Sequence, residues 1–158
     1  RAAERTHQLL YQVAGRAGRG DRPGRVLLQT YMPEHPVIQA LKAGDRDTFM
    51  AAEAESRRLC AMPPFGRLAA LIVSGTDEGV VDAAARRLGR TQPSGNGMIV
   101  LGPAPAPMAL LRGKHRRRLL LKTAKSTNLQ GVLREWLARV QPPRKVRIQA
   151  DVDPYSFL

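Results

Sequence analysis

Apolar positions in the first sixty residues recur mainly at helical spacing, which predicts three helices. Pro36 suits the first turn of the second helix, and Asp45 is the expected N-cap of the third. Between the first two lies a short β-type run, Arg25–Tyr31, which predicts a strand. The helices are expected over residues 1–13, from residue 36, and over residues 46–60, the first with Leu9, Leu10 and Val13 facing inward.

The rest of the chain alternates between strand-like and helical spacing in the order β-α-β-β-α-β. This is the split βαβ pattern, so the expected fold class is α/β in the α+β sense. The pattern places the first and third strands at the centre of the sheet and the second and fourth at its edges. The strands are expected over residues 68–73, 98–111, 116–122 and 145–152, and the helices over residues 77–88 and 129–140.

Individual residues support this arrangement. The second strand carries Pro103, Pro105 and Pro107, which cannot donate backbone hydrogen bonds and are therefore expected at a sheet edge. Trp136 lies on the apolar stripe of the last helix and is expected in the core. Asp151 and Asp153 resemble a pair of metal ligands, but Pro154 follows them, so a turn is a better interpretation than a metal site.

Composition indicates the class of partner. Lys and Arg number 26 against 13 Asp and Glu, a formal charge of +13, which favours a polyanion such as nucleic acid. An acidic membrane surface is the second candidate, although no apolar run approaches the roughly 18 residues of a membrane span. Cys60 is the single cysteine, and no Cys/His cluster has the spacing of zinc ligands, so a reducing cytosol is expected.

The chain begins with Arg1 and with a helical pattern already running, which indicates a piece of a longer protein. A proline- and glycine-containing stretch, Met62–Gly66, separates the two patterns described above. We therefore expect two domains, residues 1–64 and residues 65–158.

The most informative motif is the octet Gln12-Val-Ala-Gly-Arg-Ala-Gly-Arg19. Glycines let a backbone approach a ligand closely, and each guanidinium offers a planar fork of donors to phosphate oxygens. Gln12 adds a neutral donor and acceptor. Arginines placed in this way neutralise charge on a transferring phosphoryl group, and an arginine finger increases the rate by roughly 10³ to 10⁵. A solvated basic turn is the alternative interpretation of Arg16 and Arg19.

The octet resembles motif VI of superfamily 2 helicases, whose pattern is Gln-x-x-Gly-Arg-x-x-Arg. The wider chain resembles the primosomal protein N′ (PriA) family of replication-restart helicases. The resemblance extends over residues 3–6, 9–11, 25–31, 33–36, 55–58, 63–66, 101–106 and 151–155.

The resemblance implies the end of a RecA-like helicase lobe followed by a ribosomal-protein-like domain that binds branched DNA. It implies a bacterial, cytoplasmic 3′-to-5′ DNA helicase that uses ATP and Mg²⁺, with primosome proteins and single-stranded DNA-binding protein as partners. Arg16 and Arg19 would be catalytic, and Gln12 and Gly15 would contact nucleotide. No Walker A loop occurs in this sequence and zinc ligands of the family are absent, so the fragment alone is expected to be inactive.

A second basic motif lies at the expected turn before the third strand. It contains Arg112, Lys114, Arg116, Arg117 and Arg118, and the last strand adds Lys145 and Arg147 on its exposed side. We expect these residues to contact DNA phosphates without reading sequence. The alternative is a charged turn that keeps the sheet edge soluble.

Two other function classes remain open. One is a non-enzymatic nucleic-acid-binding module of ribosomal-protein type, for which the octet would have no use. The other is an RNA helicase, because charge and composition do not separate DNA from RNA.

Overall fold

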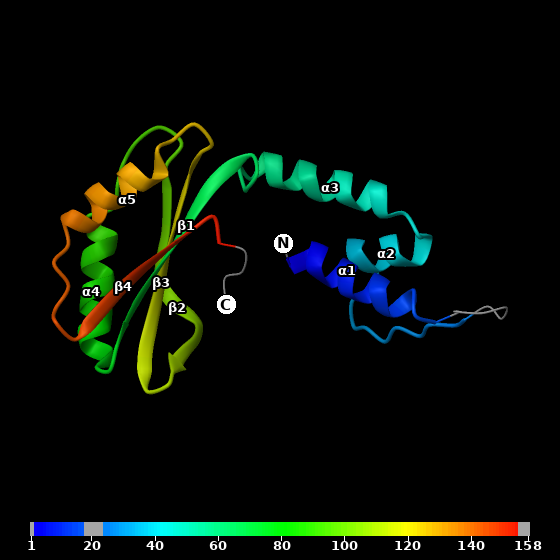
Figure 1. The fold of residues 1–158 in the computed structure, drawn as a ribbon, viewed down its shortest axis with the longest axis horizontal. Coiled ribbons are helices and arrows are strands. Elements are labelled where there is room, and N and C mark those ends of the chain that lie inside the picture. The colour runs from blue at the N-terminus through cyan, green and yellow to red at the C-terminus, as the bar shows by residue number, and fades with distance from the viewer. Residues whose placement is uncertain (1, 18–23, 155–158) are drawn as a thin grey trace. The chain divides into compact units, whose positions relative to one another are not determined.

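The computed structural model describes residues 2–17 and 24–154 and divides the chain into two compact units, Arg1–Ser56 and Arg57–Leu158 (Figure 1). The described part of the chain is a mixed α/β structure of five helices and one four-stranded antiparallel sheet. No described helix combines the length and the apolar character needed to cross a membrane.

Unit 1 is helical, and its helices are α1 (Ala2–Ala14), α2 (Pro36–Ala43) and α3 (Arg46–Leu59), the last of which continues into unit 2. The buried His7 ring of α1 stacks on Phe49 of α3, with the ring centroids 4.8 Å apart. Asp45 Oδ1 accepts a hydrogen bond from the Thr48 backbone N–H at 3.0 Å, which confirms the expected cap. The Thr48 hydrogen bonds lower the pKa of Asp45 from its ordinary value.

The prediction of a strand over Arg25–Tyr31 is wrong for this structure. The segment is irregular, and Leu27 and Tyr31 are essentially fully exposed, at 98% and 103%. A β-strand forms only beside a hydrogen-bonding neighbour, and the described residues of unit 1 otherwise form helices and turns. The inward face expected for α1 is also open, because Leu9 and Val13 are 53% and 62% exposed.

Unit 2 has the expected order of elements. The sheet order is β2-β3-β1-β4 and every neighbouring pair is antiparallel, which confirms the predicted central and edge strands. The elements are β1 (Gly66–Gly75), α4 (Glu78–Arg90), β2 (Ile99–Leu111), β3 (Lys114–Ala124), α5 (Leu129–Ala138) and β4 (Val146–Val152).

Both helices of unit 2 pack on the same face of the sheet (Figure 1). Leu71 of β1 and Leu119 and Leu121 of β3 point into this core and are fully buried. Trp136 of α5 is also fully buried, as predicted, and its Nε1 donates a hydrogen bond to the Leu88 carbonyl of α4 at 3.1 Å. We call this side of the sheet the helix face and the other side the helix-free face.

Asp153 fastens the end of β4 to the start of β1. Its Oδ1 accepts a hydrogen bond from the Leu68 backbone N–H at 3.0 Å, and its own N–H donates to the Leu68 carbonyl at 2.7 Å. Its Oδ2 accepts from Arg67 Nη2 at 2.9 Å. Asp153 has a φ of 49°, a conformation in which Asp and Asn are enriched among non-glycine residues.

Asp153→Ala should therefore destabilise the fold by about 1–3 kcal/mol, because it leaves the part-buried Leu68 N–H without its acceptor. Asp153→Asn keeps an acceptor oxygen and the tolerance of positive φ, so it should lose much less. The ion pair with Arg67 is partly exposed and adds little. Urea unfolding of both variants measures the difference. An equal loss in the two would show that the side-chain acceptor is unimportant.

Candidate functional site

The described part of the octet, residues 12–17, lies at the end of α1 and in the turn that follows it. Backbone hydrogen bonds continue one turn past the helix, from Gly15 N to Tyr11 O at 2.9 Å and from Arg16 N to Val13 O at 3.1 Å. Gln12 and Arg16 are exposed. Arg19 lies outside the described residues. The described part of the octet thus presents an amide and a guanidinium at an exposed helix end.

A pocket of about 420 Å³ lies beside this helix end, within unit 1. Gln12 lines it, together with Glu4 and Tyr11 from α1 and Arg46 and Met50 from α3. The stacked rings of His7 and Phe49 hold the two helices together at this point. Gln12 therefore has a neighbouring cation, Arg46, that sequence reasoning did not identify.

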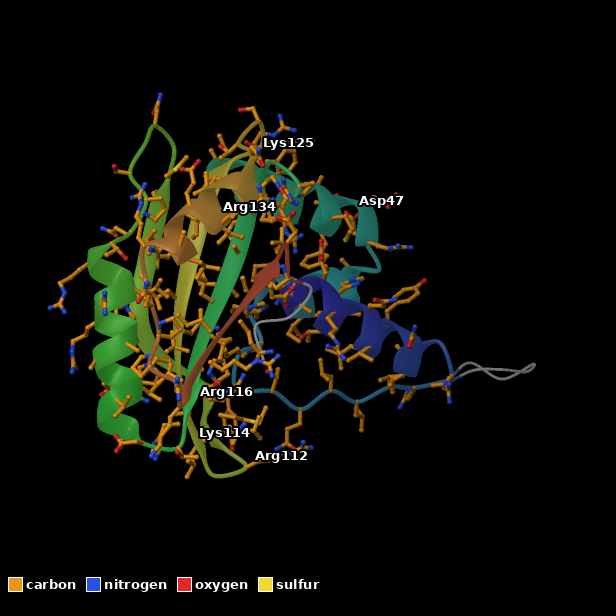
Figure 2. All side chains as sticks on the ribbon, turned by 60° about the vertical axis from the view of Figure 1, so that its left-hand side comes forward. Asp47, Arg112, Lys114, Arg116, Lys125 and Arg134 are labelled. Atoms are coloured by element: carbon orange, nitrogen blue, oxygen red, sulfur yellow. The ribbon has the colours of Figure 1, made fainter. Side chains whose placement is uncertain are left out.

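The basic motif forms a tight hairpin, and its loop is shorter than predicted. The expected turn covered residues 112–115, but β3 already begins at Lys114, so only Arg112 and Gly113 form the loop. Their φ angles are 51° and 71°, as in a two-residue type I′ turn. Gly113 adopts this conformation readily, whereas Arg112 does so at a cost in backbone strain. Figure 2 shows Arg112, Lys114 and Arg116 together at this end of the sheet.

Alternation along β3 separates the basic residues onto two faces. Successive side chains of a strand point to opposite sides, and Leu119 and Leu121 fix the odd-numbered positions on the helix face. Lys114, Arg116 and Arg118 therefore lie on the helix-free face, whereas Arg117 lies on the helix face. The continuous run of charge in the sequence is not a continuous patch in the structure.

Arg117 is occupied by carboxylates of α4. Its Nη2 lies 2.8 Å from Glu78 Oε1 and its Nε lies 2.6 Å from Asp82 Oδ1, and its side chain is only 14% exposed. The hydrogen bond to Glu78, followed by the contact with Asp82, raises the pKa of Arg117 above its ordinary value. His115 also points toward Glu78, with Nδ1 3.7 Å from Oε2. This cluster ties β3 to the first turns of α4 and cancels the charge of Arg117.

Arg116, unlike Arg117, has a neutral hydrogen-bond acceptor as its partner. Its Nη1 donates to the Pro107 carbonyl at 3.3 Å, so a neutral acceptor positions the guanidinium without cancelling its charge. Lys122, four residues after Arg118 on the same face, donates from Nζ to the Cys60 carbonyl at 2.6 Å. Sequence reasoning missed Lys122, although its even-numbered position in an alternating strand was a usable signal.

The structure also shows where the basic residues expected on the last strand, Lys145 and Arg147, lie. Arg147 and Arg116 each pair with Ser74 of β1 from opposite sides, so all three residues share the helix-free face. Lys145, just before β4, is exposed. The structure thus brings Arg116, Arg118 and Arg147 to one face and leaves Arg117 on the other.

Among residues 2–17 and 24–154, no three His, Cys, Asp or Glu side chains gather in a way that could hold a metal ion. The cations described above suit an anionic ligand.

Comparison with known proteins agrees with this picture. Residues 58–155 match the family model described as primosomal protein N C-terminal domain. Proteins described as replication restart protein PriA are similar to almost the whole chain. The sequence of Rickettsia conorii is 45% identical over 99% of this chain, that of Synechocystis sp. 39% over 99%, and that of Bacillus subtilis 34% over 100%.

The chain spans only 24%, 19% and 20% of the lengths of these three relatives, respectively. The match to the family model covers nearly all of unit 2, including the sheet and its two helices. The chain therefore belongs to the PriA family of replication restart proteins and carries the C-terminal domain of that family.

Proposed function

We propose that this chain is the C-terminal part of an ATP-dependent 3′-to-5′ DNA helicase that acts in replication restart at stalled forks. The observation that carries the proposal is the complete octet in the sequence of a chain from this family, with its described residues 12–17 at an exposed helix end. Gln12 and Arg16 are both exposed there, as residues that contact a nucleotide in a neighbouring lobe must be. The alternative, a binding module without enzymatic function, leaves this octet unexplained.

Residues 1–64 would form the end of the second RecA-like lobe. The exposed apolar segment supports this assignment, because Val26, Leu27 and Leu28 have the composition of a buried strand yet are 48%, 98% and 44% exposed. With α1 and α2 they line a groove of about 510 Å³ within unit 1. Neighbouring strands of a parallel sheet would pair with this segment and cover it.

ATP and Mg²⁺ are the cofactors of this proposal. Arg16 and Arg19 would neutralise charge on the γ-phosphate, while Gln12 and Gly15 would lie against the nucleotide. A Cβ at Gly15 would meet the Tyr11 carbonyl oxygen at 3.4 Å, an ordinary van der Waals contact, so the role given to Gly15 rests on the motif. Zinc would be a cofactor of the family, and the described residues contain no group of three potential ligands for it.

Residues 65–158 would be a DNA-binding domain of the ferredoxin-like, ribosomal-protein-like class. The antiparallel order β2-β3-β1-β4, with both helices on one face, supports this class. The hairpin and the helix-free face would contact phosphates on forks, duplexes and single strands. Other primosome proteins and single-stranded DNA-binding protein would be its protein partners in the bacterial cytoplasm.

In the full-length protein, Arg16→Ala or Arg19→Ala should lower kcat for ATP hydrolysis by about 10³-fold or more, because the transition-state charge loses a donor. DNA binding without nucleotide should hardly change. Arg25→Ala removes an exposed arginine outside the octet and is the matched control. The isolated 158-residue chain should not hydrolyse ATP. Normal turnover in both octet variants would contradict the motif assignment.

Arg112→Asn should stabilise the fold by up to about 1 kcal/mol, because Asn tolerates the positive φ better than Arg. The same change should weaken binding to duplex DNA and flatten the slope of log K against log salt by about 0.9, the effect of one lost phosphate contact. Arg134→Gln removes one charge from α5 instead and should leave the slope unchanged (Figure 2). Thermal melts and salt-dependent fluorescence anisotropy measure the two effects.

If Arg112→Asn raises the melting temperature but leaves the slope of log K against log salt unchanged, Arg112 does not contact DNA.

A further inference from the structure

The helix-free face of unit 2 carries two adjacent rows of side chains with different chemistry. The first, which we call the cation row, consists of Lys114, Arg116, Arg118 and Lys122 on β3. The second, the aliphatic row, consists of Ile99, Leu101 and Leu111 on the neighbouring strand β2.

The strand register places the rows side by side. Lys122 pairs with Ile99, Leu120 with Leu101, and Lys114 with Leu111. Residues that pair directly across an antiparallel ladder lie on the same face, with their Cβ atoms about 4.5–5.5 Å apart. The aliphatic row is 49%, 55% and 38% exposed at Ile99, Leu101 and Leu111. Exposed apolar side chains therefore flank the two ends of the cation row, with Ile99 and Leu101 near Lys122 and Leu111 opposite Lys114, while β2 shifts register between them and pairs Ala104 with Arg118.

Two members of the cation row, Arg116 and Lys122, keep their charge because their hydrogen-bond partners are neutral carbonyl oxygens. The Pro107 carbonyl accepts from Arg116, and the Cys60 carbonyl accepts from Lys122. On the adjoining strand β1, the paired residues on this face are Ser74, Ile72, Ala70 and Leu68, none of them charged. Asp151 is on the same face but lies two strands away, on β4, opposite Ala70. The carboxylates of α4 are on the other side of the sheet, with Arg117.

The spacing of the cation row suits an extended polyanion. Alternate residues of a strand are about 6.7 Å apart, and eight residues span about 27 Å. Phosphates of an extended nucleic-acid strand repeat once per nucleotide on a comparable scale. Lys114, Arg116 and Arg118 therefore offer one cation to each of several successive phosphates, and Lys122 continues the line after the apolar Leu120.

The aliphatic row distinguishes single strands from duplexes. The bases of a duplex stack on one another, so its outer surface offers phosphates and groove edges but no base faces. An unpaired strand exposes base faces, which in other single-strand binders stack sequence-independently on aromatic side chains beside a charged groove. Here aliphatic side chains occupy the corresponding place and would cover the base faces by apolar contact. A strand with its phosphates over β3 would lay its bases over β2.

We propose that the helix-free face of unit 2 is a binding track for single-stranded DNA, with phosphates on the cation row and bases on the aliphatic row. The inference rests on the proposed function, namely that unit 2 binds DNA, and it names the form of DNA and the face. Arg117 has no part in the track, although it lies between two of its members in the sequence. Its role is to hold β3 against α4.

The experiment uses the 158-residue chain and three labelled ligands of equal length: a thymidine homopolymer, an abasic phosphodiester strand and a mixed-sequence duplex. Fluorescence anisotropy is measured over a range of salt concentrations. The parent chain should prefer the thymidine strand to both other ligands, because only that strand offers phosphates and accessible base faces together.

Arg116→Gln combined with Arg118→Gln should flatten the salt slope on the thymidine strand by about 1.4, which is two contacts at about 0.7 each. Arg117→Gln is the matched control, since it removes one charge from the adjacent position on the opposite face. It should lower the melting temperature and leave the slope unchanged. An equal flattening per charge in the control would overturn the assignment of the face.

Ile99→Ser combined with Leu101→Ser tests the aliphatic row without changing charge. This variant should bind the thymidine strand several-fold more weakly than the parent, bind the abasic strand equally well, and keep the parent salt slope. Equal binding of the thymidine strand by parent and variant would overturn the role of the aliphatic row. Circular dichroism checks that each variant is folded.

Two further outcomes separate this inference from the function on which it rests. A parent chain that prefers the duplex still binds DNA, so only the single-strand track is contradicted. A parent chain that binds none of the three ligands at low salt contradicts the proposed DNA-binding function itself.

Discussion

Strand β3 has to serve two opposite environments, and the period of two in its side chains is the constraint on which the rest of unit 2 depends. Leu119 and Leu121 must enter the core beneath α4 and α5, where both are fully buried. Once these positions are fixed, every even-numbered side chain of the strand projects from the helix-free face. A shift of one residue would move the leucines out of the core and the arginines into it, so the register is strongly specified.

The same constraint gives neighbouring arginines different roles. Arg117 falls on the helix face and would be a poorly solvated charge without Glu78 and Asp82, which lie in the first turns of α4. The partners of Arg116 and Lys122 are carbonyl oxygens, so those charges remain available to an anion. The hairpin at Arg112 and Gly113 ends this arrangement at one end of the sheet, and Asp153 fixes the central strand to β4 at the other.

Much of unit 2 could be predicted from the sequence because its signals are local. Three prolines identified β2 as an edge strand, and the apolar stripe of α5 identified Trp136 as a core residue. Asp45 likewise predicted the start of α3, because its side chain caps that helix. The sequence did not reveal that the basic motif is divided between two faces of the sheet. The partner of Arg117 is Glu78, which lies 39 positions earlier in the chain. The hairpin was predicted two residues too long, since Arg112 is an unusual residue at positive φ.

Unit 1 shows the opposite case. The run Arg25–Tyr31 has the composition of a strand, but a strand also needs a neighbouring strand with which to form hydrogen bonds. In this structure the run is irregular and exposed. The octet was recognisable from the spacing of Gln12, Gly15, Arg16 and Arg19 in the sequence. The described residues place Gln12 and Arg16 at an exposed helix end, while Arg19 lies outside them.

The central claim is that strand alternation assigns the basic residues of β3 to two faces, only one of which meets DNA. The arginine side-chain Nε–H resonances report on this directly, because each guanidinium gives its own signal when a thymidine strand is titrated into the isotopically labelled chain. We expect the signals of Arg116 and Arg118 to shift in a salt-dependent manner, while that of Arg117, held by Glu78 and Asp82, stays in place. Shifts centred on Arg117 and on the residues of α4 would contradict the account.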